Sequence, residues 1–225
     1  MIQYLLKKDK GGVNDGEDKK TSLIFEPLSY LPSDILWKVL RAACADNETM
    51  PKDSGNMNKA IFWPSQSAKD SKGHVNTTNS NRVEPDVIFK FEKFTLIIEA
   101  KLKDVQNYKQ HVEQWQNELK SYRNEGNKET VIMLAVGGNE SMQHYSKGGL
   151  ELFKCSWYSL LCSICDMRDA LCQETHSAPH IVRILNDLEL IFSYYREYKI
   201  KHWAKDIGPH NISLLSHLKL PLWKI

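Results

Sequence analysis

Residues 83–101 read VEPDVIFKFEKFTLIIEAK, and this stretch decides the fold of the chain. It divides into two runs, 83–91 and 94–101, with Glu92-Lys93 between them. Each run is rich in aromatic and β-branched residues, which is typical of a strand. We therefore predict a β-hairpin with its tip at Glu92-Lys93.

The pairing of this hairpin separates apolar from ionic side chains. Successive strand residues point to opposite faces, and directly opposed residues share a face. Asp86 then faces Glu99, and Glu84 faces Lys101. The apolar residues fall together on the other face: Val87, Phe89, Phe91, Phe94, Leu96 and Ile98. A symmetric four-residue loop keeps this pairing, whereas a three-residue loop breaks it and moves every side chain to the wrong face.

The ionic face holds two opposed carboxylates, which destabilise a sheet unless something compensates for their repulsion. Mg²⁺ is a natural compensation, because it prefers one or two carboxylates together with waters or phosphate oxygens. We therefore expect Asp86 and Glu99 to bind a divalent cation. The alternative is a surface hairpin with cross-strand ion pairs, which stabilise little in water. In that reading Glu84 is the ion-pair partner of Lys101.

Length and composition restrict the class of protein. The chain has 225 residues and a net charge of +2, with 41% hydrophobic and 26% charged residues, as expected for one soluble globular domain. No apolar run approaches the ~20 residues that span a bilayer, and the N-terminus does not resemble a signal peptide. The odd number of cysteines, five, argues against a disulfide framework. We expect a cytoplasmic protein that does not enter a membrane.

Periodicity predicts the remaining elements. We expect helices at about 33–44, 105–124, 158–172 and 180–199, and strands at 60–63, 130–136 and 150–157. Polar segments at about 7–20 and 64–82 are expected to be flexible loops, and the last 20 or so residues to form a tail that packs back. Because residues 130–136 are almost all apolar, they indicate a strand buried on both faces and a parallel crossover. The pattern predicts an α/β fold, a mixed sheet flanked by helices with a helical C-terminal part.

Pro85-Asp86, followed by Glu99-Ala100-Lys101 on a hairpin that precedes a helix and a buried strand, resembles the PD-(D/E)XK nuclease superfamily. The resemblance is to prokaryotic members and covers about residues 30–200 of a single domain, 1–225. It implies a restriction-endonuclease-like fold and a Mg²⁺- or Mn²⁺-dependent endonuclease that hydrolyses phosphodiester bonds in DNA. A homodimer and a role in defence are further expectations from the same resemblance.

The resemblance also assigns roles to individual residues. It implies that Asp86 and Glu99 are the metal-binding carboxylates, and that Lys101 orients the attacking water and stabilises the developing charge. Many family members add a glutamate from the first helix. The predicted helix 33–44 contains none, which leaves three candidates: Asp34, Glu48 and, as the preferred metal ligand, Glu26.

Many members also place a glutamine on the helix that follows the Glu-x-Lys triplet, where it steadies the water or the phosphate. Four glutamines are available here: Gln106, Gln110, Gln114 and Gln116. Gln114 occupies about the expected position and is our candidate.

Two other functions remain open. One is a catalytically silent nuclease-like module that binds nucleic acid or a protein partner. The other is a zinc-stabilised interaction domain, because Cys162-x-x-Cys165 is followed by His176 and His180. The gap is shorter than in a zinc finger and the cysteines lie in an apolar, helix-like stretch, so core packing explains them better.

Overall fold

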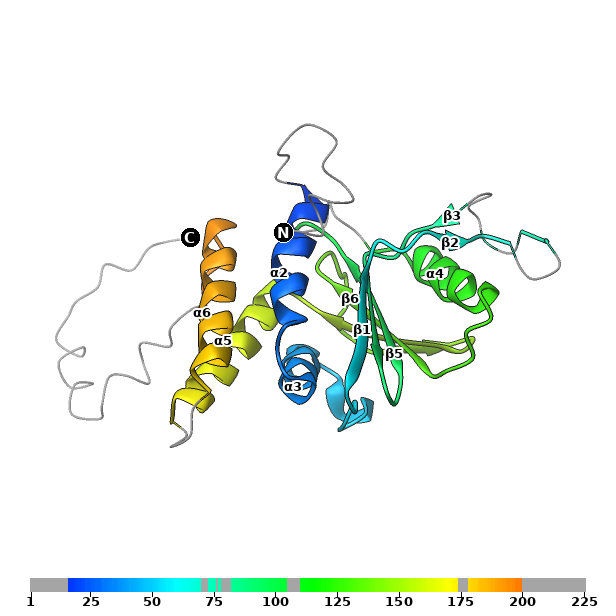
Figure 1. Ribbon diagram of the computed structural model, residues 1–225. Coiled ribbons are helices and arrows are strands. Elements are labelled where there is room, and N and C mark those ends of the chain that lie inside the picture. The colour runs from blue at the N-terminus through cyan, green and yellow to red at the C-terminus, as the bar shows by residue number, and fades with distance from the viewer. Residues whose placement is uncertain are drawn as a thin grey trace, which may run out of the picture.

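A six-stranded mixed sheet forms the centre of the computed structural model, which describes residues 16–69, 73–75, 77, 82–104, 110–173 and 178–199 (Figure 1). The strand order is β1-β4-β5-β6-β8-β7. The strands are β1 (Met57–Phe62), β4 (Val87–Phe91), β5 (Thr95–Ala100), β6 (Val131–Val136), β7 (Tyr145–Lys147) and β8 (Leu150–Cys155). A separate two-stranded sheet pairs β2 (Gln66–Ser67) with β3 (Arg82–Val83).

Strands β4 and β5 form the predicted hairpin, and its register is confirmed. Val87 lies opposite Ile98, and Lys90 lies opposite Thr95. The Phe91 N–H donates to the Phe94 carbonyl at 2.9 Å, which closes a two-residue tip. Alternation of side chains along both strands was enough to predict this pairing, although Glu-Lys is not a favoured tip sequence.

The first strand of the hairpin is shorter than we predicted. Pairing between β4 and β5 begins at Val87, and residues 82–83 pair with β2 instead. Pro85 lacks a backbone N–H and cannot continue a ladder. The prediction that Glu84 faces Lys101 across a sheet is therefore wrong, and Glu84 lies exposed in the connection between β3 and β4.

The centre of the sheet is parallel. Strand β5 pairs in parallel with β6, and β6 in parallel with β8, while the other pairs are antiparallel. Every residue of β6 is buried, as its apolar sequence predicted. Consecutive parallel strands end at the same edge of a sheet, so the residues that follow β5, β6 and β8 are neighbours. Lys101, for example, donates its N–H to the Val136 carbonyl at 2.8 Å.

Helices cover both faces of this sheet. They are α2 (Glu17–Leu28), α3 (Ser33–Ala43), α4 (Val112–Asn124), α5 (Trp157–Gln173) and α6 (Pro179–Tyr194). Figure 1 shows α4 on one side and the other four on the opposite side. The larger core, which includes Phe89 and Leu96, packs under those four helices, and the smaller one, around Ile97 and Trp115, packs under α4.

Helix α2 is the main departure from the predicted elements. We expected residues 7–20 to form a loop, but the described end of that segment is helical from Glu17 onward. Acidic residues in its first turn favour a helix start, and Ile24, Phe25 and Leu28 are fully buried against the core. Residues 105–109 of the helix expected at 105–124 lie outside the described residues, and so does the expected tail of the last 20 or so residues.

Candidate functional site

The candidate site lies where β5 ends. The backbone there is held from several sides: besides the bond to Val136, the Lys101 carbonyl accepts the Trp157 indole N–H at 2.5 Å. Gly137, on the neighbouring strand end, has φ +71°, and a Cβ at this position would lie 2.8 Å from Trp157 Nε1 and 2.9 Å from the Lys101 oxygen. The close approach of these backbones therefore requires glycine.

Asp86 and Glu99 come together at this strand end, as predicted from the hairpin register. Both are buried, at 7% and 3% exposure. One Asp86 oxygen accepts the Ala100 N–H at 2.8 Å. Glu99 Oε1 accepts the Lys101 ammonium at 2.6 Å and the Gln114 amide at 2.5 Å. The structure thus brings four of the five predicted site residues into one place.

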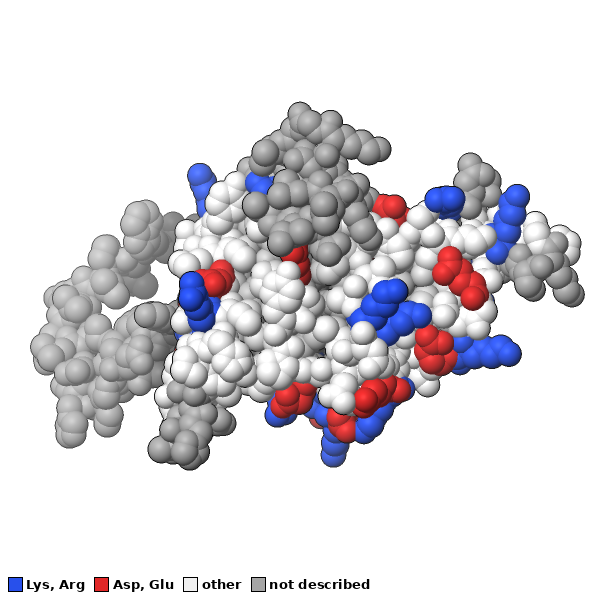
Figure 2. All heavy atoms as spheres, viewed as in Figure 1, with Lys and Arg blue, Asp and Glu red and all other residues white. Residues whose placement is uncertain are grey.

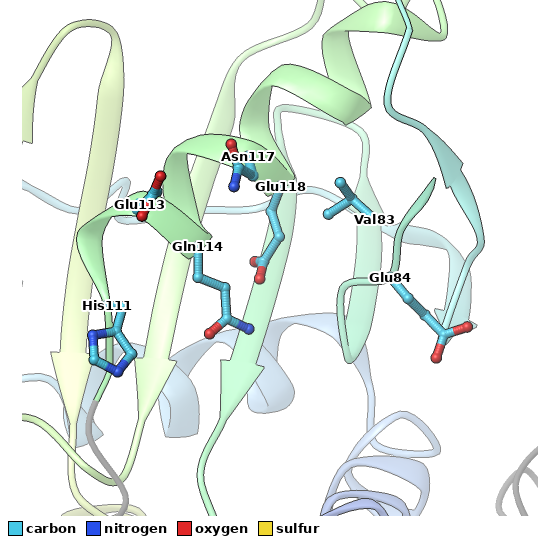
Figure 3. Close-up of a pocket in the computed structure, with 7 residues that line it drawn as sticks. All are labelled: Val83, Glu84, His111, Glu113, Gln114, Asn117 and Glu118. Atoms are coloured by element: carbon cyan, nitrogen blue, oxygen red, sulfur yellow. The ribbon is translucent and has the colours of Figure 1, made fainter. Parts of the chain in front are cut away.

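Helix α4 adds a third acid, which was not predicted from the sequence. Glu118 is 1% exposed and hydrogen-bonds to Glu99, and its Oε2 is buried without a hydrogen-bond partner. Glu118 follows Gln114 by four residues, so both lie on one face of α4 and point toward the end of β5 (Figure 3). This spacing was a usable signal. We call Asp86, Glu99 and Glu118 the acid cluster.

Burial and mutual repulsion govern the charge of the acid cluster. Burial, followed by the charge of Glu99, raises the pKa of Asp86 well above its usual range. Burial also raises the pKa of Glu99, although Lys101 works in the opposite direction. Burial, then Glu99 and Asp86, raise the pKa of Glu118 well above its usual range. An opposite charge placed among these groups would favour their ionised forms.

Lys101 remains a cation in this setting. Burial lowers its pKa, but the charge of Glu99, their hydrogen bond and the charges of Glu17 and Asp86 outweigh burial and raise it above the usual value. An ammonium that holds its proton this firmly is a poor general base. It can orient a ligand and neutralise negative charge.

Helix α2 places an acid, Glu17, beside Lys101. Glu17 Oε1 lies 3.5 Å from the Lys101 ammonium, and Glu17 Oε2 accepts the Leu102 N–H at 2.9 Å. The predicted ligand Glu26 is nine residues further along α2, about 13 Å along its axis. Its carboxylate bonds to Ser22 and Tyr30. The structure therefore places Glu17, and not Glu26, beside Lys101.

The alternative glutamine Gln110 and the candidate zinc ligands do not join the acid cluster. Gln110 donates to the Glu99 carbonyl at 3.1 Å and so supports the strand end rather than the carboxylates. Cys162 and Cys165 both lie on α5, where burial raises the pKa of the Cys165 thiol to about 11, which disfavours the thiolate that zinc binds. His176 lies outside the described residues.

Among the residues that the structure describes, no three His, Cys, Asp or Glu side chains are arranged to hold a metal ion. A Mg²⁺ ion needs only one or two carboxylates, so Asp86 and Glu99 suffice in principle.

On the face seen in Figure 2, basic and acidic side chains are interspersed. In the part of the chain that the structure describes, the helices are too short or too polar to cross a bilayer.

Comparison with known proteins gives a relative and a distant structural match. No family model matches the chain. The "Uncharacterized protein PM0110" of Pasteurella multocida (strain Pm70) is 28% identical over 229 residues, which cover 94% of this chain and 81% of that protein. The small subunit of the heterodimeric restriction endonuclease R.BspD6I is similar with a TM-score of 0.25 and 10% identity, over 76% of this chain and 97% of that one. The function must therefore be inferred from the site.

Proposed function

We propose that this chain is a Mg²⁺-dependent nuclease of the PD-(D/E)XK type, with a restriction-endonuclease-like fold, that hydrolyses phosphodiester bonds in DNA. One observation carries the proposal. Two buried carboxylates, Asp86 and Glu99, share the end of a buried strand with an ammonium, Lys101, that lies 2.6 Å from Glu99. Like charges are rarely buried together unless a cation compensates for them.

The chemistry of the donor set fits Mg²⁺ or Mn²⁺. Asp86 and Glu99 would hold the ion, with Glu17 as the nearest acid on a first helix, and all three offer the oxygen ligands that these hard cations prefer. When bound, the ion supplies a Lewis acid for a phosphoryl oxygen and lowers the pKa of a water.

The chain's own residues then have distinct tasks. The Lys101 ammonium orients the water or the scissile phosphate and neutralises the charge that builds up on phosphorus oxygens. The Gln114 amide holds Glu99 in one orientation through its 2.5 Å hydrogen bond. Burial of the acid cluster keeps bulk water away, which strengthens each of these interactions.

Cleavage of a plasmid and of labelled oligonucleotides in Mg²⁺ or Mn²⁺ tests the proposal. We expect Glu99→Gln and Lys101→Ala each to lower the rate on the order of 100-fold or more. Lys93→Ala is the matched control: it removes a lysine from the same hairpin, where it pairs with Asp53 at the exposed tip. Equal rates in all four proteins would refute the assignment.

One feature favours a catalytically silent binding module as the second candidate. Glu99 Oε1 already accepts hydrogen bonds from both Lys101 and Gln114, so this oxygen is engaged by the chain's own side chains. A silent module predicts nucleic-acid binding that weakens with salt but is indifferent to Mg²⁺ and to Glu99→Gln. Fluorescence anisotropy with and without Mg²⁺ separates the two candidates.

A further inference from the structure

Lys154, on β8, lies in the same row across the sheet as Glu99. Glu99 pairs in parallel with Ala135 on β6, and Ala135 pairs in parallel with Lys154. Helix α4 contacts the same face at both ends of this row. Gln114 donates to Glu99, and the Lys154 ammonium lies over the ring of Trp115. Because neighbouring strands are about 4.8 Å apart, the Cα atoms of Glu99 and Lys154 are about 10 Å apart.

Among the residues that the structure describes, the Lys154 ammonium contacts an aromatic ring and no carboxylate. It lies 5.6 Å from the centre of the Trp115 ring. Its side chain is half-buried, and burial lowers the pKa of Lys154 with no neighbouring charge to raise it again. Taking an ammonium out of water without a counter-charge is unfavourable. An anionic ligand would therefore stabilise the charged form of Lys154.

Two other lysines near the end of β5 are already neutralised by carboxylates. Lys101 contacts Glu99 at 2.6 Å, and Lys20 contacts Glu197 at 2.6 Å. An incoming anion must compete with those carboxylates for either ammonium. At Lys154 no carboxylate of the described residues competes.

The ring that carries the Lys154 ammonium is held in place relative to Glu99. Trp115 is buried, and its indole N–H donates to Gln110 Oε1 at 2.9 Å. The Gln110 amide in turn donates to the Glu99 carbonyl at 3.1 Å. A cation over the face of Trp is attracted by the ring. These contacts therefore restrict the ammonium to one region beside the end of the row.

We propose that Lys154 binds a backbone phosphate of the substrate strand, on the β8 side of the scissile phosphate. The inference rests on the nuclease function proposed above and deepens it by adding a second contact with the nucleic acid. A strand carries one charge per about 3.4 Å of helix axis, so a cation about 10 Å from Glu99 lies within about three nucleotides of the cut. Such a contact positions the strand without reading its sequence.

The salt dependence of binding tests the contact. A labelled single-stranded oligonucleotide is titrated with protein in EDTA at several NaCl concentrations, and binding is followed by fluorescence anisotropy. Lys154→Met should weaken binding about 10-fold and reduce the slope of log K against log salt by about 0.7, the loss of one phosphate contact. Lys154→Arg should retain both values. Lys147→Met is the matched control, because Lys147 is exposed on the same face at the other end of β8, opposite Leu150.

Cleavage in Mg²⁺ locates the phosphate. In oligonucleotides with one central methylphosphonate, which is uncharged, wild type should cut about 10-fold less at one linkage, at a fixed offset within about three nucleotides of the neutral one. Lys154→Met should cut that linkage as well as its neighbours. Its KM for the unmodified oligonucleotide should be about 10-fold higher, with kcat unchanged, because the contact does not involve the reacting atoms.

The outcomes separate this inference from the nuclease function. Cleavage with equal salt slopes in wild type and Lys154→Met overturns the phosphate contact and leaves the nuclease intact. A reduced slope without a Lys154-dependent offset in the cleavage pattern also overturns it, because the charge then acts only at long range. If no oligonucleotide is cut, the nuclease function fails and the slopes in EDTA decide: a loss in Lys154→Met that Lys147→Met lacks supports the contact, and equal slopes overturn it. A lower urea midpoint of Lys154→Met with an unchanged slope shows a structural role and overturns it too.

Discussion

Replacing Lys20 by Met should destabilise the fold more than replacing any surface lysine. Lys20 lies on α2, three residues after Glu17, and its side chain is only 1% exposed. Its ammonium donates to Glu197 at 2.6 Å and to the Leu102 carbonyl at 3.0 Å, and lies 4.2 Å from the centre of the Trp157 ring. Lys20 therefore joins α2, the segment after α6 and the strand end that carries Lys101.

The magnitude follows from the burial of this pair. Removing one partner of a buried ion pair costs about 3–5 kcal/mol. Glu197 keeps 23% exposure and can be partly hydrated after the substitution, so we expect the lower end, about 3 kcal/mol. At about 2–4 °C per kcal/mol for a chain of this size, Lys20→Met should lower the melting temperature by roughly 6–12 °C.

Urea and thermal unfolding followed by circular dichroism measure this effect. Lys38→Met is the matched control, because Lys38 pairs with Asp34 on the exposed face of α3, with both side chains 60% exposed or more. Such a pair contributes at most about 1 kcal/mol. The double variant Lys20→Met/Glu197→Leu also removes the Glu197 carboxylate, which would otherwise stay partly buried without its ion-pair partner. We therefore expect the double variant to be more stable than Lys20→Met alone. If Lys20→Met lowers the free energy of unfolding no more than Lys38→Met does, the buried ion pair does not stabilise the fold as argued.

Three further predictions concern the site and its support. Because the pKa values of the acid cluster are raised, these three groups bind more protons in the folded chain than in the unfolded chain. Without divalent ions, their contribution to the free energy of unfolding should therefore fall as the pH rises above about 4.5. Asp86→Asn in EDTA should then melt at a higher temperature than wild type at pH 7.5, and a lower melting temperature would contradict this. Gly137→Ala should lower the free energy of unfolding by about 2–4 kcal/mol, because it combines a positive φ with a steric clash. Gly126→Ala, where φ is positive but no atom lies close to the added Cβ, should lower it by only about 1–2 kcal/mol. Equal losses of unfolding free energy in urea titrations would show that the close approach of Gly137 to Trp157 and Lys101 is unimportant. Trp157→Phe should cost about 1–3 kcal/mol in the same titrations, because the Lys101 carbonyl loses its indole donor, and an unchanged midpoint would exclude this role.

The hairpin and the buried strand could be predicted because their signals are local. Alternation along residues 83–101 determined which side chains share a face, and the structure has the same register. Asp86 and Glu99 followed from that register without any knowledge of the rest of the fold. Glu118 had a local signal too, since it follows Gln114 by one helical turn, and it could have been included.

Helix α2 could not be predicted in the same way, because its stability depends on distant residues. Lysine is almost never fully buried unless it is paired, and the partner of Lys20 is Glu197, at a separation of 177 residues. The sequence around Lys19 and Lys20 therefore looks like a solvated loop. Glu17 was missed for the same reason, and Glu26 was preferred only because it lies close in sequence to the helix that was expected.

The position of Lys101 depends on this helix. Within one turn of α2, Glu17 accepts the N–H of Leu102 and Lys20 donates to its carbonyl, so a single helix holds both polar groups of the residue that follows Lys101. On the other side, Trp157 holds the Lys101 carbonyl and Val136 its N–H. The hairpin alone therefore brings Asp86 and Glu99 together, but it does not determine where the ammonium lies. Because charge stabilisation depends on placement within about 0.5 Å, the geometry of the proposed catalytic lysine is set by residues outside the motif that revealed it.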